Sequence, residues 1–456
     1  MTTFATVNPT TGELVQEFEP LTDEGVTASL LAAERAYRSW SRRIIEDRAA
    51  VLARLADAYR RHARDLARLM TLEMGKPIAQ ALGEVELAAS IYEYYAKKGP
   101  PLLADEELDI AGSGRALVRT APIGPLLGVM PWNFPYYQAA RFVAPNLLLG
   151  NTILLKHAPN CPQQSLRMEE LALDSGAPPG VYQNVFASND QVADMIASPE
   201  VQGVSLTGSE RAGKAIGELA GRHLKKCVLE LGGSDPFIVL PDADLDVAVP
   251  AAVAGRFGNA GQVCTSSKRF IVDETVFDRF LDRFLAGAAD WTSSDPTLPE
   301  SRLGPLSSVA ARDELVGQVQ DAIEKGALLH LGGEVPDGPG AWYPATVLSG
   351  VTPTMRAYRE ELFGPVAVLY SVASVEEAIK LANDSPYGLA GAVFTSDGDL
   401  ADRIADRLEV GMVGLNTTVK SAPDLPFGGV KNSGIGRELA RFGVDEFANK
   451  KLIRLA

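Results

Sequence analysis

The 456-residue sequence has few cysteines, few histidines and no long apolar run. Its three cysteines, Cys161, Cys227 and Cys264, are scattered along the chain, so they indicate a reducing compartment rather than a disulfide framework. The four histidines lack metal-ligand spacing, and no metal site is predicted. No apolar stretch approaches the roughly 18 residues that cross a bilayer. The residues from Met1 to Phe4 do not begin a signal peptide, so a cytoplasmic location is expected.

The sequence also lacks an excess of basic residues. Its formal net charge of -15 argues against a nucleic-acid partner and against an anionic membrane surface. Hydrophobic residues at 46% and charged residues at 22% are ordinary for a globular protein. A chain of this length is too long for one hydrophobic core, so two or three domains are expected.

The first hundred residues predict helices. One helix is predicted from apolar positions that recur at spacings of three and four, namely Leu52, Leu55, Tyr59, His62, Leu66 and Leu69. Gly75-Lys76-Pro77 is expected to end it. A second helix is expected to run to about Lys98, before Gly99-Pro100-Pro101, and residues 111–119 predict a short strand.

From about residue 125, short apolar strands alternate with helices. The strands predicted in the first series are 126–130, 152–156, 184–186, 203–206 and 227–231. The helices between them are expected to begin near Tyr136, Pro162, Asp190 and Ser209. The strands predicted in a second series are 236–240, 269–272, 366–369, 391–394 and 411–416. This alternation predicts two doubly wound α/β domains with parallel sheets and a break near residue 232.

Cys264 differs from the other two cysteines in its surroundings. It follows Asn259-Ala260-Gly261-Gln262-Val263, where glycine and small polar residues predict an open, tight loop. Cys227 lies in an apolar run and is expected to be buried. Glu230 ends the same run, where burial would disfavour its ionised form and suit a general base or acid. A thiol and a carboxylate within reach are the minimum apparatus for covalent catalysis followed by hydrolysis.

Three other segments are candidates for binding, each with a structural alternative. The turn Thr207-Gly208-Ser209 precedes a helix whose N–H groups suit a pyrophosphate, although it lacks the usual dinucleotide fingerprint and a plain turn is the alternative. Lys156 ends a strand, where it suits ribose hydroxyls or is simply an exposed lysine. Residues 131–135 contain two prolines that would hold Asn133 rigidly, either as an oxyanion donor or as a capping residue.

Together these motifs closely resemble the NAD(P)-dependent aldehyde dehydrogenase superfamily, from Asn8 to the last strand. The matching segments, in order, are 131–135, 207–209, 230–233, 261–264, 360–366, 426–431 and 433–438. The resemblance implies a Rossmann-like cofactor domain over residues 1–105 and 120–231 and a catalytic thiol domain over 232–440. It also implies a bridging or oligomerisation element, over 106–119 and 441–456, that assembles a homodimer or homotetramer.

The resemblance implies a catalytic role for three residues. Cys264 would attack a small-molecule aldehyde to form a thiohemiacetal, whose oxyanion is held by Asn133 and the backbone N–H of Cys264. Hydride transfer to the nicotinamide would leave a thioester on Cys264. Glu230 would then activate the water that releases the carboxylic acid. Glu438 matches a residue that serves as a possible proton relay, whereas the family's relay lysine is replaced here by Phe142.

The resemblance also implies a cofactor site. Its expected residues are Trp132, Lys156, Thr207, Gly208, Ser209, Gly213, Leu231, Glu361 and Phe363. Lys156 would contact the adenine-side ribose and Glu361 the nicotinamide-side ribose, with Phe363 near that ring. Pro159 stands where an acidic residue often disfavours a 2′-phosphate, so NAD and NADP both remain open.

Within the superfamily, the sequence is most similar to bacterial succinate-semialdehyde dehydrogenases. Arg141 matches an arginine that grips the distal carboxylate of the substrate, with Tyr137 on the same helix, and a structural salt bridge is the alternative for Arg141. A second arginine of some such enzymes is Gly258 here, and Lys268, Arg256 and Lys420 are its candidate replacements.

Other functions remain as alternatives. An aldehyde dehydrogenase of different specificity and a CoA-acylating enzyme are the nearest, and the presence of Glu230 favours hydrolysis over transfer to CoA. A thiol hydrolase without redox chemistry and a non-catalytic protein with the same fold are more distant, because neither needs a nucleotide site.

Overall fold

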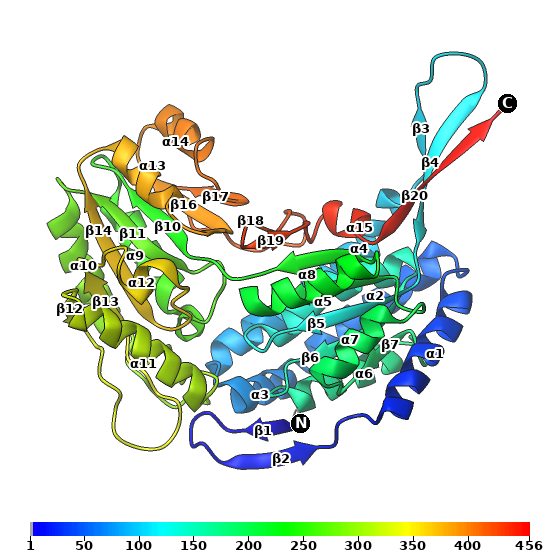
Figure 1. The fold of residues 1–456 in the computed structure, drawn as a ribbon, viewed down its shortest axis with the longest axis horizontal. Helices are drawn as coiled ribbons and strands as arrows, with labels where there is room; N and C mark the ends of the chain where they lie inside the picture. Colours follow the sequence, from blue (N-terminus) through cyan, green and yellow to red (C-terminus); the bar gives the residue numbers. More distant parts are fainter. Residues whose placement is uncertain (1–2) are drawn as a thin grey trace.

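The computed structural model describes residues 3–456; Met1 and Thr2, where the N-terminal stretch analysed above begins, lie outside them. The chain forms two lobes, each built on a sheet, and a narrow three-stranded arm that projects from one lobe (Figure 1). No helix in residues 3–456 combines the length and the apolar character needed to cross a membrane.

The N-terminal region contains the predicted helices, preceded by a hairpin that was not predicted. Its elements are β1 (Phe4–Val7), β2 (Leu14–Phe18), α1 (Asp23–Trp40), α2 (Ile45–Arg61), α3 (Ala63–Met74) and α4 (Ile78–Leu102). The prediction of one helix through Leu69 is wrong, because His62, with φ -101° and ψ 14°, leaves the helical conformation between α2 and α3. Also, α4 continues through Pro100 and Pro101 instead of ending near Lys98, and Gly99 within it packs so closely on Leu148 that a Cβ there would collide.

The first lobe contains a sheet with the strand order β19-β9-β8-β5-β6-β7 among the described residues. Its strands are β5 (Pro125–Met130), β6 (Thr152–His157), β7 (Tyr182–Asn184), β8 (Gly203–Thr207), β9 (Lys226–Glu230) and β19 (Gly434–Ile435). Its helices are α5 (Pro135–Leu149), α6 (Pro162–Asp174), α7 (Asn189–Ala197) and α8 (Glu210–Arg222). The strands pair in parallel except β19, which is antiparallel to β9. The strand predicted at 184–186 lies two residues earlier in the structure, because β7 begins at Tyr182 and ends at Asn184.

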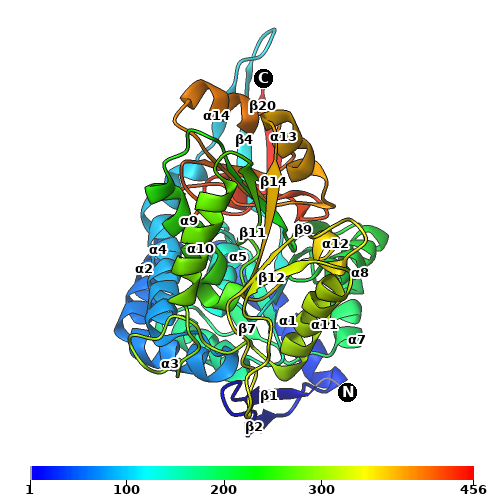
Figure 2. The same ribbon diagram turned by 90° about the vertical axis from the view of Figure 1, so that its left-hand side faces the viewer.

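The second lobe contains a sheet with the strand order β12-β13-β14-β11-β10-β16-β17 in the described part of the chain. Its strands are β10 (Asp235–Val239), β11 (Ser267–Asp273), β12 (Leu328–Leu331), β13 (Thr346–Ser349), β14 (Val366–Val372), β16 (Ala390–Phe394) and β17 (Met412–Leu415). Its helices are α9 (Leu245–Phe257), α10 (Phe277–Ala289), α11 (Val309–Glu324), α12 (Arg356–Arg359), α13 (Val375–Asn383) and α14 (Gly398–Ala405). In Figure 2, α9 and α10 lie on one side of the strands and α11 on the other. The predicted α/β fold class is thereby confirmed.

The projecting arm is an antiparallel sheet of β3 (Glu106–Leu108), β4 (Arg115–Pro122) and β20 (Ala448–Leu455). The strand predicted over 111–119 therefore begins later and runs further than expected. β20 pairs with β4 along its whole length, and Leu452 on it is 63% exposed. Of the remaining short elements, β18 (Val430–Lys431) and α15 (Phe442–Asp445) lie between the second lobe and the arm in Figure 1, and β15 (Tyr387–Gly388) pairs with β18. The chain leaves the first sheet after Glu230 and enters the second at Asp235.

Candidate active site

A cavity of about 270 Å³ brings together residues from the first lobe, the loop before β11 and the loop before β14. Its lining residues are Pro131, Trp132, Asn133, Gln138, Thr207, Gly208, Ser209, Glu230, Leu231, Gly232, Cys264, Glu361 and Phe363. All three predicted catalytic residues and most of the predicted cofactor residues are among them. The first-lobe residues converge because the carboxyl ends of β5, β8 and β9 meet at one edge of the first sheet, and the loops at the amino ends of β11 and β14 face that edge.

The loop that carries Cys264 is held in an unusual backbone conformation. Asn259 and Ala260 have φ of 52° and 51°, in the left-handed region that non-glycine residues seldom adopt. Gly261 continues this turn, and a Cβ there would lie 2.2 Å from the carbonyl oxygen of Gly364. The glycine is therefore required for the loop to approach the segment that contains Phe363.

Cys264 is half-buried, and its surroundings keep the thiol protonated. Burial raises the pKa of the Cys264 thiol to about 11, while the positive charges of Arg141 and Lys268 act in the opposite direction. Glu361 and Asp235, also nearby, raise it further. The open loop predicted from the sequence is thus less exposed than expected, because it packs under the cavity.

We expect the alkylation of Cys264 by iodoacetamide in the cofactor-free protein to accelerate with pH. The reactive species is the thiolate, so the rate should rise about tenfold per pH unit up to the region of the pKa near 11. Mass spectrometry of the peptide that contains Cys264 measures this rate without interference from the other cysteines. A rate that levels off at neutral pH would contradict the raised pKa.

Asn133 is positioned as an oxyanion donor. Its amide Nδ2 donates to the carbonyl oxygen of Gln262 at 2.9 Å, which uses one of its two hydrogens. In residues 3–456, no hydrogen bond engages the backbone N–H of Cys264. One amide hydrogen of Asn133 and this N–H are therefore available to an oxygen beside Cys264.

A buried ion pair supports Asn133, and no sequence pattern predicts this pair. Lys76 donates to the backbone carbonyl of Asn133 at 2.8 Å and pairs with Glu84. Glu84 accepts from the backbone N–H groups of Tyr136 and Tyr137, at the start of α5. The sequence indicates only the end of a helix at Gly75-Lys76-Pro77, because an ion pair between a loop lysine and a helical glutamate eight residues later has no sequence signature.

Glu230 ends β9 and is 2% exposed. Burial, together with the nearby Glu438 carboxylate, raises its pKa well above the usual range, while Arg141 opposes this. Neither carboxylate oxygen has a hydrogen-bond partner in the described part of the chain. The predicted disfavouring of its ionised form is consistent with this environment, which suits a group that takes up a proton.

Arg141 is completely buried and already has partners. Its Nε lies 2.7 Å from Glu438, and its Nη1 donates to the Tyr137 hydroxyl at 3.1 Å. Its guanidinium also stacks between the rings of Tyr137 and Phe427, at 4.8 and 4.2 Å from their centroids. The salt bridge considered as the alternative for Arg141 is therefore present. Phe142, in place of the family's relay lysine, packs against Phe447.

The Tyr137 hydroxyl continues this chain of contacts by donating to Ser421, which lines a second cavity of about 460 Å³. Lys420 lines the same cavity and is exposed. The other two candidates to replace the arginine absent at Gly258 point elsewhere. Lys268 and Arg256 are buried and bind backbone carbonyl oxygens.

The predicted cofactor residues divide into two groups. At one end, Ser209 caps α8 by accepting from the N–H of Ala212, and Gly213 lies against Leu231, where a Cβ would come within 2.5 Å. At the other end, Trp132 and Phe363 stack edge to face at 5.7 Å. Lys156 lies outside the cavity on β6, and burial lowers its pKa.

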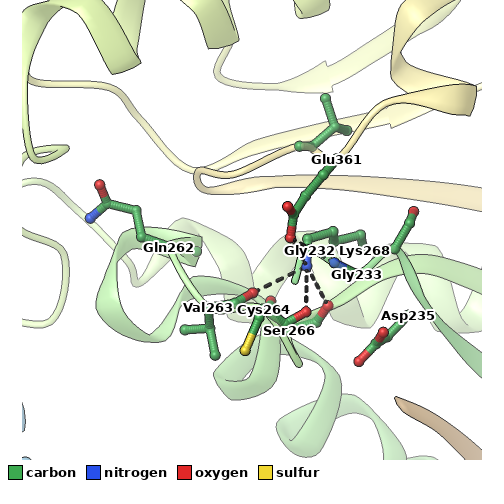
Figure 3. A network of polar contacts seen from close by, with 12 residues as sticks. Gly232, Gly233, Asp235, Gln262, Val263, Cys264, Ser266, Lys268 and Glu361 are labelled. Carbon is green, nitrogen blue, oxygen red and sulfur yellow. Dashed lines mark hydrogen bonds and ion pairs between the residues drawn. The ribbon is translucent and has the colours of Figure 1, made fainter. Parts of the chain in front are cut away.

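The Glu361 side chain lines the cavity, and one of its carboxylate oxygens, Oε1, is bound by neighbouring protein groups. Its Oε1 accepts from the backbone N–H of Gly233 at 3.0 Å and lies 3.3 Å from Nζ of Lys268, a contact shown in Figure 3. A Cβ on Gly232 would come within 2.3 Å of its Oε2. The glycines of the 230–233 motif thus let this carboxylate lie against the backbone.

Gln138 lines the cavity, although no sequence pattern identifies it as a site residue. Its Oε1 is buried and has no hydrogen-bond partner among the residues described. Its position three residues before Arg141, on the same face of α5, was the only available sign. Cys227, predicted to be buried, is half-buried, and no cluster of metal-ligating residues occurs in residues 3–456.

Comparison with known proteins agrees with the sequence motifs. The succinate-semialdehyde dehydrogenase [NADP(+)] of Deinococcus radiodurans is 53% identical, covering 99% of this chain and 94% of that protein. The succinate semialdehyde dehydrogenase [NAD(P)+] Sad of Escherichia coli is 46% identical, covering 97% and 96%. The crystal structure of the Streptococcus pyogenes succinic semialdehyde dehydrogenase in complex with NADP+ superposes with a TM-score of 0.97 at 44% identity, covering 99% of both chains. The sequence profile of the aldehyde dehydrogenase family matches residues 1–453, and the chain therefore belongs to this family.

Proposed function

We propose that the protein oxidises an aldehyde to the carboxylic acid with NAD(P)+ and releases the acid by hydrolysis. The observation that carries this proposal is the convergence of Cys264, the Asn133 amide and Glu230 on one cavity. The same cavity contains the Trp132–Phe363 aromatic pair and the Glu361 carboxylate, which suit a nicotinamide riboside.

The chemistry follows from these side chains. The Cys264 sulfur adds to the aldehyde carbon after its proton is lost to solvent, and the oxyanion is held by Asn133 and the Cys264 N–H. The nicotinamide, when bound, supplies the hydride acceptor that turns this adduct into a thioester. Glu230 then removes a proton from water as the water attacks the thioester carbon, and Cys264 leaves as the thiol. Glu438, beside Glu230, is the proposed relay for the protons that accumulate there.

NAD and NADP both fit the residues present. The N–H groups at the start of α8, with Ser209 and Gly208, suit the pyrophosphate. Lys156 has no hydrogen-bond partner in residues 3–456 and suits the adenine-side ribose or its 2′-phosphate. Pro159 nearby carries no charge that would repel that phosphate. Because the relatives are named as NADP(+) or NAD(P)+ enzymes, we propose that NADP is accepted.

Succinate semialdehyde is the proposed substrate, as in the names of these relatives. A distal carboxylate would meet the hydroxyls of Tyr137 and Ser421, with the Arg141 charge directly behind Tyr137. Arg141 would thus act through Tyr137, because its Nε is paired with Glu438 and its Nη2 donates to Thr207. Exposed Lys420 lines the same cavity as Ser421 and adds a second positive charge beside it.

A panel of aldehydes, each with NAD and with NADP, tests the function by the absorbance of the reduced cofactor. We expect kcat/KM for succinate semialdehyde to exceed that for butanal by a factor of about ten or more, the value of one charge-assisted hydrogen bond. If turnover required CoA, the CoA-acylating alternative would be favoured. Equal rates with both aldehydes would favour an aldehyde dehydrogenase of broad specificity. No turnover with any aldehyde would refute the proposal.

The Tyr137→Phe variant locates the carboxylate site within this panel. It removes only the hydroxyl and leaves the Arg141–Glu438 pair in place. It should raise KM for succinate semialdehyde by about tenfold and leave KM for butanal nearly unchanged. An equal change in both values would remove Tyr137 and Arg141 from the carboxylate site.

We also propose a domain division between residues 231 and 232, which the separation of the two sheets supports. Assembly as a homodimer or homotetramer is supported by the exposed apolar side chains of β20 on the projecting arm. The cytoplasmic location rests on three cysteines that are free in the described structure.

A further inference from the structure

Lys268 is a buried cation that the proposed chemistry does not use. Its side chain is 1% exposed and enters from β11, four residues after Cys264. Its Nζ donates to the carbonyl oxygens of Val263, Cys264 and Ser266, at 3.1, 3.0 and 3.2 Å (Figure 3). These three bonds tie the ammonium to both sides of the nucleophile.

The same ammonium contacts the opposite side of the cavity. Nζ of Lys268 lies 3.3 Å from Oε1 of Glu361, which is on the loop before β14. Gly233 donates to the same oxygen, and a Cβ on Gly233 would come within 2.7 Å of the Cys264 carbonyl oxygen. The nucleophile loop, the 230–233 motif and Glu361 therefore converge on one ammonium group.

The charge environment supports the same connection. Asp235 is another acidic group near Lys268. Burial raises the pKa of Asp235 to about 7, and Lys268 opposes that shift. Burial lowers the pKa of Lys268 itself, whereas Glu361 and Asp235 raise it. The charged groups that face Cys264 are Arg141, Lys268, Glu361 and Asp235. A buried ammonium with three backbone acceptors and carboxylates nearby is costly to build, and a purely apolar residue would fill the same space.

We propose that Lys268 is a positioning residue that fixes the ribose-binding carboxylate of Glu361 and the Cys264 loop relative to each other, so that cofactor binding and thiol reactivity depend on the same ammonium group. This inference rests on the proposed roles of Cys264 and Glu361. In it, Lys268 presents Oε2 of Glu361 to the ribose by holding Oε1, and its charge favours the Cys264 thiolate. It does not touch the substrate, in contrast to the expectation that it replaces the missing arginine at Gly258.

The Lys268→Met variant tests this proposal, because methionine nearly matches the length of lysine without its charge. We expect cofactor to bind about tenfold more weakly, as measured by quenching of tryptophan fluorescence. We also expect the alkylation of Cys264 at neutral pH, without cofactor, to slow by about threefold or more, since a favourable charge is lost. Lys225→Met is the matched control, because it also removes an ammonium that binds backbone carbonyl oxygens, those of Ser198 and Val201, but does not line the cavity. The control should leave cofactor affinity within about twofold of the wild-type value.

A second variant tests the same inference if the Lys268→Met protein does not fold. Glu361→Gln changes a side chain that is 18% exposed, so the fold should tolerate it. Removing this negative charge leaves the Lys268 charge less compensated, and Cys264 alkylation at neutral pH should become faster. A folded Lys268→Met protein with unchanged cofactor affinity and alkylation rate would overturn the inference, as would unchanged or slower alkylation in Glu361→Gln. Neither result would affect the proposed function, which instead fails if Cys264→Ser retains turnover.

Discussion

The Cys264→Ser protein is expected to form no measurable reduced cofactor with any aldehyde. The loss in kcat/KM should be on the order of 10⁴ or more, because a serine hydroxyl is a far weaker nucleophile than a thiol and the Glu230 carboxylate is too weak a base to make an alkoxide of it. Serine is nearly isosteric with cysteine, so the strained loop from Asn259 to Gly261 should keep its conformation. The measurement is the absorbance of the reduced cofactor with succinate semialdehyde at saturating cofactor.

The Cys227→Ser variant is the matched control for this loss. Cys227 lies on β9 three residues before Glu230, is half-buried, and does not line the cavity. Its replacement should leave turnover within about twofold of wild type. Cofactor titration of Cys264→Ser by tryptophan fluorescence should show unchanged affinity. Turnover of Cys264→Ser above about one per cent of wild type would remove the thiol from the mechanism.

The Glu230→Gln protein is expected to release one burst of reduced cofactor and then stall. Glutamine matches glutamate in shape but cannot accept the proton of the attacking water, so the thioester on Cys264 accumulates. Steady turnover should fall by about 10² to 10⁴, the usual contribution of a general base. Because neither oxygen of Glu230 has a hydrogen-bond partner in residues 3–456, the substitution should not disturb the fold. Stopped-flow absorbance measures the burst, which should approach one equivalent per active site.

Hydroxylamine provides the control for this experiment. It is a strong nucleophile that attacks a thioester without help from a general base, so it should restore turnover in Glu230→Gln. Mass spectrometry should find the acyl group on Cys264 before hydroxylamine is added and not afterwards. Steady turnover of Glu230→Gln without hydroxylamine would show that another group activates the water.

Much of the site was predictable because its chemistry depends on local motifs. Cys264 with its glycine-flanked loop, Glu230 at a strand end and Asn133 between two prolines are each recognisable from neighbouring residues. The order of these motifs along the chain adds to the prediction, since Asn133 and Glu230 lie at the carboxyl ends of β5 and β9, which meet at one edge of the first sheet. The same reasoning predicted most of the strands to within a residue or two. Where it failed, as at His62 and at Gly99, packing between helices outweighed the local signal.

Other features depend on contacts between distant segments. Arg141 has the sequence context of a carboxylate-binding residue, yet its guanidinium is paired with Glu438, almost 300 residues away. The Lys76–Glu84 pair supports Asn133 across two helices, and Lys268 joins the Cys264 loop to Glu361. None of these partners is specified by spacing, because side chains far apart in the chain meet only when the sheets are assembled.

The sequence by itself therefore determined which residues carry the chemistry and which family the chain belongs to, since a nucleophile, a base and a phosphate-binding turn each need particular residue types in a particular local order. Only the tertiary structure decided the environment of those residues. The burial that raises the pKa of Cys264 and of Glu230, and the buried cations that oppose it at Cys264, arise from the packing of the two lobes against each other. Burial and charge at a site are sums over all neighbours in space, and those neighbours come from every part of the chain.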